Sequence, residues 1–227
     1  MEQLQVGLVG AKGRMGRAVT AAAAEASHPT IAVELGRGSA LGPAIDTCDV
    51  VIDFSVAEAT EAVCRACAAR QKPLVLGTTG HEAAQKKLIA EAALKIPIVF
   101  AANFSVGVNA LFALTKRAAE LLGGKFDVDV IEMHHRTKKD APSGTAKRLI
   151  GLLSDARGPD QAVSAQSIRA GDIVGEHTVL FTGPGERLEL THRAASRETF
   201  VVGALRAARW VIDQPPGLYT MENVLGL

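Results

Sequence analysis

Residues 4–16 read LQVGLVGAKGRMG, a short apolar run followed by a turn that carries glycine at positions 10, 13 and 16. The apolar run predicts a buried strand, and the alanine-rich residues 17–26 beyond the turn predict a helix. Glycine permits a tight turn and lets the backbone approach a pyrophosphate, while the helix start offers unpaired N–H donors. Lys12 occupies the place of a second glycine, so the spacing is G-x-x-G-x-x-G rather than G-x-G-x-x-G. The stretch therefore predicts a strand–turn–helix unit that binds a dinucleotide.

The alternation of strand and helix continues to about residue 101. Further apolar runs predict strands over residues 31–35, 49–54, 73–76 and 96–101, with helices over 57–69 and 82–94. Such alternation is typical of an α/β protein with a doubly wound, Rossmann-type parallel sheet and helices on both faces. Ligands bind these sheets at the carboxyl ends of the strands, so a site is expected in the turns that follow them.

The pattern changes after Phe104. The residues predict helices over 108–122 and from about Pro142, a strand over 126–133, and short strands over 166–170, 177–182 and 187–191. Short strands joined by glycine turns favour a smaller α+β domain with a mixed or antiparallel open sheet. The last long helix, 199–212, is expected to return to the first domain. We therefore predict a dinucleotide-binding domain at 1–104, completed by residues from about 199 to 227, and a second domain at 105–198.

Composition and charge exclude several classes of protein. The chain has 227 residues, 48% of them hydrophobic, and a net charge of +1, so neither nucleic acid nor a membrane surface is expected as a partner. No apolar run approaches the roughly 18 residues of a transmembrane helix, and no secretory signal is visible, which favours a cytoplasmic protein. The three cysteines indicate neither a disulfide framework nor a metal site. Cys64 and Cys67 form a C-x-x-C inside a predicted helix and are expected to be packing residues.

The most informative stretch is residues 132–146, which read EMHHRTKKDAPSGTA. A predicted strand ends just before a loop that begins at His134. This loop contains two histidines and several cations, and it leads to the start of a helix. Ser143, Gly144 and Thr145 would present N–H groups and hydroxyls to an anion, and histidine can deliver a proton near neutral pH. Residue by residue, a solvated basic loop before a capped helix is the simpler interpretation. Beside a dinucleotide-binding domain, a carboxylate or phosphate receptor with a histidine acid is favoured.

Two further turns bear on the choice of cofactor. An acid at the end of the second strand would bind a ribose 2′-hydroxyl, but Glu34 lies within the predicted strand and Arg37 lies in the loop beyond it. An arginine there could hold a 2′-phosphate, which favours NADPH, or use of both cofactors, over strict use of NADH. The sequence GTTG at residues 77–80 suits packing beside a ribose or nicotinamide, and an ordinary turn explains it equally.

Residues 132–146 are similar to the signature of the 4-hydroxy-tetrahydrodipicolinate reductase family, also called dihydrodipicolinate reductase, of the lysine pathway. Supporting matches, which extend over essentially the whole chain, are GAKGRMG at 10–16, GTTG at 77–80, AANFSVGVN at 101–109 and RAGDIVGEH at 169–177. The resemblance implies an NADPH- or NADH-dependent oxidoreductase that reduces a cyclic imine dicarboxylate, with overall loss of water. It also implies that the second domain binds substrate and that its sheet forms a homotetramer.

The resemblance assigns roles to individual residues, and no metal-binding residue is predicted. His134 matches the family's proton donor and Lys138 its catalytic partner. Matches to the substrate-carboxylate contacts are His135, Gly144 and Thr145, with Ser143 nearby. Matches to the cofactor contacts are Gly10, Ala11, Lys12, Gly13, Arg14, Met15, Gly77, Thr78, Thr79, Ala101, Ala102, Asn103 and Phe104. Arg197 and Phe200 are further candidates, which would close over the nicotinamide.

Two departures from the family's pattern affect the cofactor. Family members often carry Glu-Arg after the second strand, whereas this chain has Gly36-Arg37, which argues against a preference for NADH. The connection from Arg37 to Asp49 is short and is expected to lack a strand or loop beside the adenosine, with looser binding and a higher KM. The alternatives are another two-domain reductase, such as an aspartate dehydrogenase, and a regulatory module that binds NAD(P) without turnover. A semialdehyde dehydrogenase would need a cysteine nucleophile, and no cysteine is suitably placed.

Overall fold

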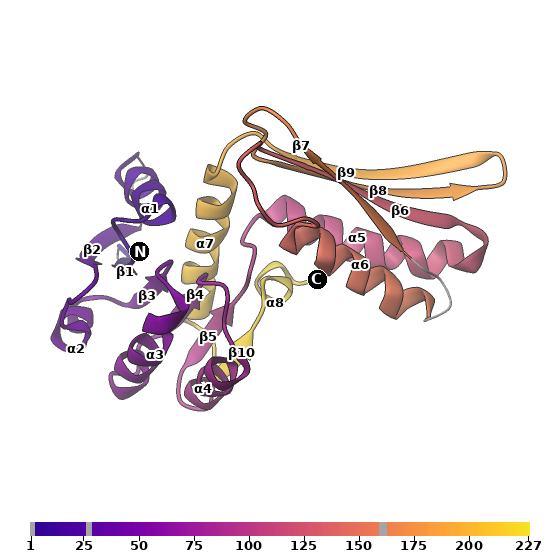
Figure 1. The fold of residues 1–227 in the computed structure, drawn as a ribbon. Coiled ribbons are helices and arrows are strands. Elements are labelled where there is room, and N and C mark those ends of the chain that lie inside the picture. Colours follow the sequence, from indigo (N-terminus) through magenta and orange to yellow (C-terminus); the bar gives the residue numbers. More distant parts are fainter. Residues whose placement is uncertain (1–2, 26–28, 159–162) are drawn as a thin grey trace. The chain divides into compact units, whose positions relative to one another are not determined.

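The structure is a computed structural model that describes residues 3–25, 29–158 and 163–227 (Figure 1). The chain divides into two compact units. Unit 1 comprises Met1–Ser105 together with Glu198–Leu227, and unit 2 comprises Val106–Arg197. In Figure 1, unit 1 therefore combines the indigo start of the chain with its yellow end. Within the described ranges, no helix is both long and apolar enough to cross a membrane.

Unit 1 is built on a parallel sheet of six strands in the order β10-β5-β4-β3-β1-β2. The strands are β1 (Gln5–Val9), β2 (Thr30–Leu35), β3 (Val50–Asp53), β4 (Leu74–Leu76), β5 (Pro97–Phe100) and β10 (Gly217–Tyr219). The central strand β3 is buried along its whole length, which explains its continuous apolar run. The predicted doubly wound parallel sheet is confirmed.

Helices cover both faces of this sheet (Figure 1). One face packs against α1 (Arg14–Glu25), α7 (Glu198–Val211) and α8 (Met221–Leu225). The other face packs against α2 (Leu41–Ala44), α3 (Thr60–Ala69) and α4 (Ala83–Ala93), with 3-10 turns at Ile45–Thr47 and Ala57–Ala59. Successive strand residues point to opposite faces, so Val50 and Ile52 join the first cluster and Val51 joins the second.

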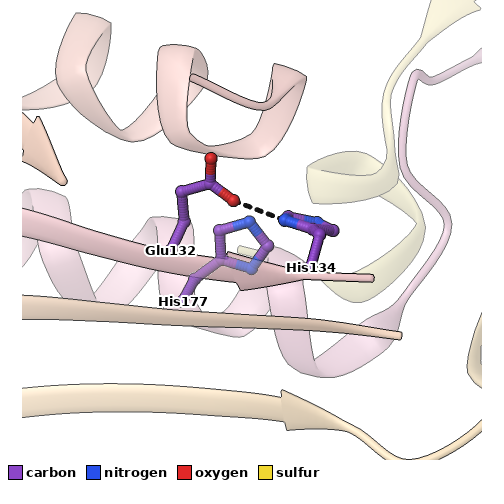
Figure 2. Close-up of side chains that lie close together, drawn as sticks. All are labelled: Glu132, His134 and His177. Carbon is purple, nitrogen blue, oxygen red and sulfur yellow. Dashed lines mark hydrogen bonds and ion pairs between the residues drawn. The ribbon is translucent and has the colours of Figure 1, made fainter. Parts of the chain in front are cut away.

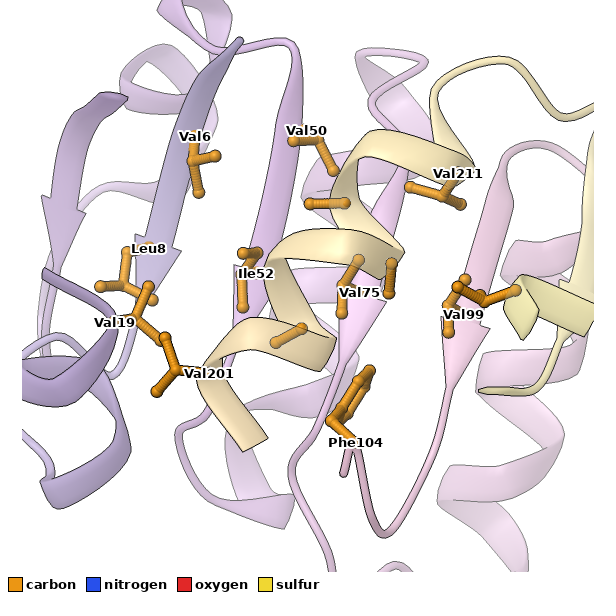
Figure 3. Packing of buried hydrophobic residues seen from close by; sticks show 14 of the residues in the cluster. Val6, Leu8, Val19, Val50, Ile52, Val75, Val99, Phe104, Val201 and Val211 are labelled. Atoms are coloured by element: carbon orange, nitrogen blue, oxygen red, sulfur yellow. The ribbon is translucent and has the colours of Figure 1, made fainter. Parts of the chain in front are cut away.

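Helix α7 lies in the middle of unit 1, although it comes from the end of the chain (Figure 3). Its side chains Val201, Ala204 and Val211 are fully buried against the sheet. The approach is close at Gly203, where a Cβ would lie 1.7 Å from the carbonyl oxygen of Phe104. Glycine therefore lets α7 reach the backbone that follows β5.

Unit 2 contains a mixed sheet of four strands in the order β7-β6-β8-β9. These are β6 (Asp127–His134), β7 (Ser164–Arg169), β8 (Gly175–Gly183) and β9 (Glu186–Ala194), of which only the β6–β7 pair is parallel. Helices α5 (Val106–Leu122, followed by a 3-10 turn at Gly123–Lys125) and α6 (Gly144–Arg157) pack on one face around Val130 and Val179. The alternation of β6 directs Ile131 and Met133 to the opposite face.

The structure departs from the sequence-based expectations in several places. Helix α1 begins at Arg14, so residues 14–16 are helical rather than part of the turn. Ser143 is the N-cap of α6 and Pro142 precedes it, because the serine hydroxyl accepts a helical N–H and proline cannot. His134 is the buried last residue of β6 rather than the start of a loop. Strand β10 and helix α8 were not predicted.

The short connection from Arg37 to Asp49 holds α2 and a 3-10 turn, and none of its residues, all of which the structure describes, forms a strand. Cys48, Cys64 and Cys67 are free thiols buried in the cluster around α3. Burial raises the pKa of all three, and that of Cys64 to about 11. The packing role predicted for the C-x-x-C pair is confirmed, because a buried neutral thiol is a poor nucleophile.

Candidate active site

Neither Gly10, in the turn after β1, nor Gly16, in α1, has room for a side chain. Gly10 has a φ of +82°, and a Cβ on it would lie 2.6 Å from the carbonyl oxygen of Phe54. Glycine is therefore required at this position for two reasons: it adopts a positive φ readily, and it has no Cβ to clash with Phe54. A Cβ on Gly16 would lie 2.3 Å from the carbonyl oxygen of Gly10, so α1 packs directly against the turn. The two glycines bring the start of α1 to the carboxyl end of β1.

The start of α1 fits a phosphate group. The N–H of Arg17 donates to the carbonyl of Gly13 at 3.0 Å, and the N–H groups of a first helical turn have no acceptor within their helix. The N–H of Gly13 donates to the carbonyl of Gly10 at 2.9 Å, while Lys12 and Arg14 are exposed, so positive charge is accessible there. A helix start of this kind binds the pyrophosphate of a dinucleotide. The residues present therefore suit a pyridine nucleotide.

Phe54, which follows β3, connects three of the predicted cofactor segments. A Cβ on Gly77 would lie 2.1 Å from its ring atom Cε1, and the ring of Phe104 packs edge-on with its centroid 5.8 Å away. Its backbone carbonyl lies against Gly10, as described above. Burial raises the pKa of the preceding Asp53, whose carboxylate accepts the N–H of Ser55 at 2.8 Å. The sequence located this turn at the ligand edge without assigning Phe54 a role.

Residues 77–79 and 101–104 also lie at the carboxyl edge of the sheet. The N–H of Gly77 donates to the carbonyl of Asp53 at 2.9 Å, and that of Ala101 to the carbonyl of Leu76 at 3.2 Å. Thr78 is buried, whereas Thr79 and Ala102 are exposed. The side chain of Asn103 accepts the N–H of Ser105 at 2.8 Å.

The remaining cofactor candidates are more scattered. Arg37 is exposed in the turn beyond β2. Glu34 accepts a hydrogen bond from the hydroxyl of Thr20 at 2.9 Å, so this acid is directed at α1. Arg197 is exposed and directly precedes α7, and Phe200 is half-buried in the first turn of that helix.

Three buried side chains meet in unit 2, as Figure 2 shows. Glu132 and His134 are two residues apart on β6 and therefore point to the same face of the sheet. His177 of β8 lies directly opposite Glu132 in the antiparallel register. The exposed fractions of the three residues are 0%, 8% and 3% in that order, so water hardly reaches them.

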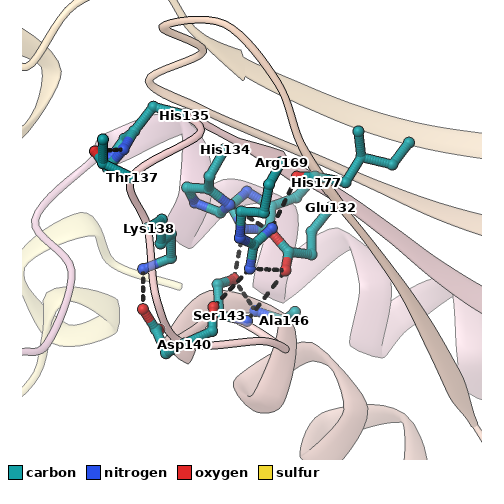
Figure 4. Close-up of polar contacts among 11 residues, drawn as sticks. Glu132, His134, His135, Thr137, Lys138, Asp140, Ser143, Ala146, Arg169 and His177 are labelled. Carbon is teal, nitrogen blue, oxygen red and sulfur yellow. Dashed lines mark hydrogen bonds and ion pairs between the residues drawn. The ribbon is translucent and has the colours of Figure 1, made fainter.

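Glu132 is the centre of a hydrogen-bond network (Figure 4). Its Oε2 contacts Nδ1 of His134, while its Oε1 accepts from the Arg169 guanidinium at 2.7 Å and from the N–H of Ser143 at 3.3 Å. Burial opposes its ionisation, but hydrogen bonds from Arg169, Ser167 and His134 outweigh burial and lower its pKa to about 2. Because these donors occupy both oxygens and Arg169 adds positive charge, the cluster is arranged as a hydrogen-bond network rather than a cation site.

The two histidines of the cluster are mainly neutral at pH 7. Burial lowers the pKa of His134, although the adjacent Glu132 carboxylate opposes that effect. Burial also lowers the pKa of His177, to about 4, and its Nε2 lies 3.2 Å from the hydroxyl of Ser143. The two rings pack edge-on with centroids 5.1 Å apart. His134 is thus held in a close-packed position between a carboxylate and a second imidazole.

The loop after β6 carries Lys138, the other predicted catalytic residue, and His135, a predicted substrate contact. Arg169 donates to the carbonyl of Asp140 at 2.6 Å and so ties the loop to β7. Lys138 forms an ion pair of 2.8 Å with Asp140 and keeps 22% of its side chain exposed. Nδ1 of His135 lies 2.7 Å from the hydroxyl of Thr137.

The loop ends at the start of α6. Ser143 is buried, and its hydroxyl accepts the N–H of Ala146 at 3.2 Å. Gly144 is exposed and Thr145 is half-buried, so the helix start can be reached from solvent. Helix N-termini bind carboxylates through N–H donors and the dipole.

Glu132, Arg169 and His177 are part of the site but were not among its predicted members. The period of a strand could have indicated Glu132, because it shares a face with His134. Arg169 and His177 stand at the two ends of the run 169–177, which was noted only for its resemblance. Their approach depends on pairing between strands far apart in the sequence, which no local pattern reveals.

Comparisons with known proteins identify the family of the chain. The family models described as dihydrodipicolinate reductase, N-terminus and C-terminus, match residues 4–104 and 107–225. A 4-hydroxy-tetrahydrodipicolinate reductase of Akkermansia muciniphila is 48% identical over 97% of each chain, and one of Halorhodospira halophila is 43% identical over 99% of each. The fold is similar to that of a dipicolinate-bound dihydrodipicolinate reductase from Paenisporosarcina sp. TG-14, with a TM-score of 0.84, 22% identity and coverage of 98% and 99%. The chain belongs to the 4-hydroxy-tetrahydrodipicolinate reductase family.

Proposed function

We propose that this protein is an NAD(P)H-dependent 4-hydroxy-tetrahydrodipicolinate reductase, an oxidoreductase of lysine and diaminopimelate biosynthesis. In the overall reaction a hydride and a proton enter the cyclic dicarboxylate, one water leaves, and tetrahydrodipicolinate forms. Family membership supports the choice of substrate. The observation that carries the proposal is the buried His134 in unit 2, followed by a cationic loop and an accessible helix start.

Unit 1 would hold the cofactor. Residues 10–15, which form the turn after β1 and the start of α1, supply helix N–H donors and the cations Lys12 and Arg14 for the pyrophosphate. Residues 77–79 and 101–104 line the same edge of the sheet and, through the packing at Phe54, keep a fixed position relative to that turn. When bound, the reduced nicotinamide supplies the hydride.

Arg37 favours NADPH, or use of both cofactors, over strict use of NADH. It is exposed in the turn beyond β2, where a 2′-phosphate binds in folds of this type. Glu34 is directed at Thr20 instead, so the acid that would bind a ribose 2′-hydroxyl is engaged elsewhere.

Unit 2 would bind the substrate and supply the proton. The N–H groups at Gly144 and Thr145 and the side chains of His135 and Lys138 provide donors and positive charge for two carboxylates. His134 would donate the proton, because imidazole exchanges protons near neutral pH. Its nearly complete burial keeps bulk water away from the proton that is transferred.

We further propose that the protein is a homotetramer of the cytoplasm. Helices α5 and α6 cover one face of the unit 2 sheet, while Ile131, Met133 and Leu180 share the other face. Packing of that face against a second copy would bury these apolar side chains. Sedimentation equilibrium measures the assembly, and a monomer at micromolar concentration contradicts it.

The test of the activity is a coupled assay in which the preceding synthase generates the substrate from pyruvate and aspartate semialdehyde. Oxidation of NADPH and of NADH is followed at 340 nm in parallel. Turnover supports the proposal, and His134→Gln is expected to lower kcat by roughly 10²–10⁴-fold. Cofactor binding, followed by nicotinamide fluorescence, serves as the control that the variant is folded. A folded wild-type protein that binds NADPH without turnover would instead be a regulatory module or a reductase of another substrate.

A further inference from the structure

Glu132 has no role in the proposed function so far, yet it is the most buried charged group among the described residues of unit 2. We propose that Glu132 is a positioning residue, which holds the proton of His134 on Nδ1 and thereby makes Nε2 the atom that exchanges the catalytic proton. The inference rests on the proposed function only where it concerns turnover. The statement about the two ring nitrogens stands on the geometry of unit 2 alone.

The first step of the argument is the state of the carboxylate. The pKa of Glu132 is about 2, so the group is ionised at neutral pH and can only accept hydrogen bonds. Its Oε2 contacts Nδ1 of His134, and that contact is a hydrogen bond only if Nδ1 carries the proton. Neutral His134 is therefore the Nδ1–H form, with a lone pair on Nε2. Protonated His134 gains its second proton on Nε2 and can release that proton alone without breaking the contact to Glu132.

The second step is what holds the carboxylate in place. Arg169 donates to Oε1 of Glu132 at 2.7 Å and Ser143 donates its N–H to the same oxygen at 3.3 Å. Neither group can accept a proton in return, so both fix the carboxylate as an acceptor. Arg169 comes from β7 and Ser143 from the start of α6, so two further elements set the orientation of the acid. The imidazole is thus oriented by a buried carboxylate, as in other acid–base sites.

The third step concerns Nε2 itself. A Cβ on Gly175 of β8 would lie 3.1 Å from Nε2 and 3.3 Å from Cδ2 of His134. Gly175 does not have a positive φ, so backbone conformation does not demand glycine there. Glycine at this position leaves space beside Nε2, the ring nitrogen that Glu132 does not contact. Two independent features therefore lead to the same assignment. The donor–acceptor pair at Nδ1 holds a proton there, and the missing side chain beside Nε2 leaves that nitrogen to exchange the catalytic proton.

Nitrogen-15 NMR of the wild-type protein, selectively labelled at histidine, tests the geometry without any substitution. Above the pKa of His134, its ring is expected to show a protonated Nδ1 and an unprotonated Nε2. A ring with the proton on Nε2 would overturn the inference, whatever the protein catalyses. This measurement also separates failure of the inference from failure of the proposed function, because it needs no turnover.

Glu132→Gln is the sharpest substitution. Arg169 can only donate, so it would take the amide oxygen, and the amide NH₂ would then face Nδ1 of His134. The neutral ring is expected to switch to the Nε2–H form, and kcat to fall by between tenfold and the roughly 10²–10⁴-fold of His134→Gln. Because Glu132 acts through His134, the double variant should have a kcat within about twofold of His134→Gln alone.

The pH profile separates a positioning role from a merely structural one. The charged and titratable groups around His134 are Glu132 on β6, Arg169 on β7, His177 on β8 and Lys138 in the loop. Of these, only Glu132 favours the protonated ring, so its loss should move the decline of kcat to lower pH. Glu132→Asp keeps the charge and should restore part of kcat and the wild-type profile.

Matched controls complete the experiment. Glu120→Gln removes an acid from an exposed ion pair on α5 of the same unit and is expected to leave kcat and its pH profile unchanged. Gly175→Ala should lower kcat with little change in the cofactor KM, because the new Cβ crowds the His134 ring at Nε2 and Cδ2. An active wild type whose folded Glu132→Gln variant keeps its kcat, tautomer and pH profile would refute the proposal. If that variant does not fold, the wild-type spectrum and the Gly175→Ala kinetics decide it.

Discussion

Replacing Gly203 in α7 by alanine is expected to destabilise unit 1. The new Cβ would lie 1.7 Å from the carbonyl oxygen of Phe104, so backbone must move by more than an ångström to reach an ordinary contact. Overpacking costs about 1–3 kcal/mol, while removing a glycine from a helix interior returns about 0.5–1 kcal/mol. The resulting net loss of about 1 kcal/mol would lower the Tm of a protein of this size by about 2–4 °C.

Gly151 provides the matched control. It also lies inside a helix, α6, but a Cβ there would have no heavy atom of another element within 4 Å. Gly151→Ala should therefore raise the Tm by a few degrees, from the helix gain of about 0.5–1 kcal/mol alone.

Thermal unfolding followed by circular dichroism compares the two variants with the wild type. A second readout is the Kd for NADPH, which should rise in Gly203→Ala because Phe104 belongs to a proposed cofactor segment. The reasoning is wrong if Gly203→Ala melts at or above the wild-type temperature, since α7 would then not be held against the backbone after β5.

Three further predictions concern the two sites. Arg37→Ala should lower kcat/KM for NADPH more than for NADH, and equal losses in the 340 nm assay would exclude a contact to the 2′-phosphate. Gly77→Ala would place a Cβ 2.1 Å from the Phe54 ring and should raise the cofactor Kd measured by fluorescence, with no change in the substrate KM if the effect is local. The folded pKa of His177 is about 4 against an ordinary value of about 6.5, so the unfolded chain binds more protons and stability declines as the pH falls between these values. That decline, on the order of 3 kcal/mol, should be absent in His177→Phe when urea unfolding is compared at pH 7 and pH 4; a decline as large as in the wild type would disprove it.

Much of unit 1 could be predicted from sequence because its central strands are apolar on both sides. The runs at Val50–Asp53 and Leu74–Leu76 are buried throughout, and each is bounded by a turn or a helix with a distinct composition. Strand β10 escaped prediction because it has only three residues, none fully buried, directly after two prolines. Its pairing with β5 is a tertiary contact that three residues cannot encode.

The site in unit 2 shows the same limit. Local sequence indicated the histidines, the cations and the helix start, because all of them lie within residues 132–146. The sequence predicts a helix start at Pro142, but the hydroxyl of Ser143 caps the helix and Pro142 precedes this cap. Arg169 reaches Glu132 only because β7 pairs with β6 in parallel, with His134 opposite Arg169. A register between distant strands follows from the packing of the whole unit and not from either segment.

Helix α7 has a consequence for the order in which this chain is made. Ribosomes synthesise proteins from the N-terminus, and domains commonly fold as they emerge. Here the buried side chains of Val201, Ala204 and Val211 reach the sheet of unit 1 only after residues 106–197 have been translated. Until then the sheet of unit 1 has part of one apolar face uncovered, whereas unit 2, a continuous segment, can fold first. A stop codon near the end of the coding sequence would therefore destabilise unit 1, most of which is synthesised first, more than unit 2.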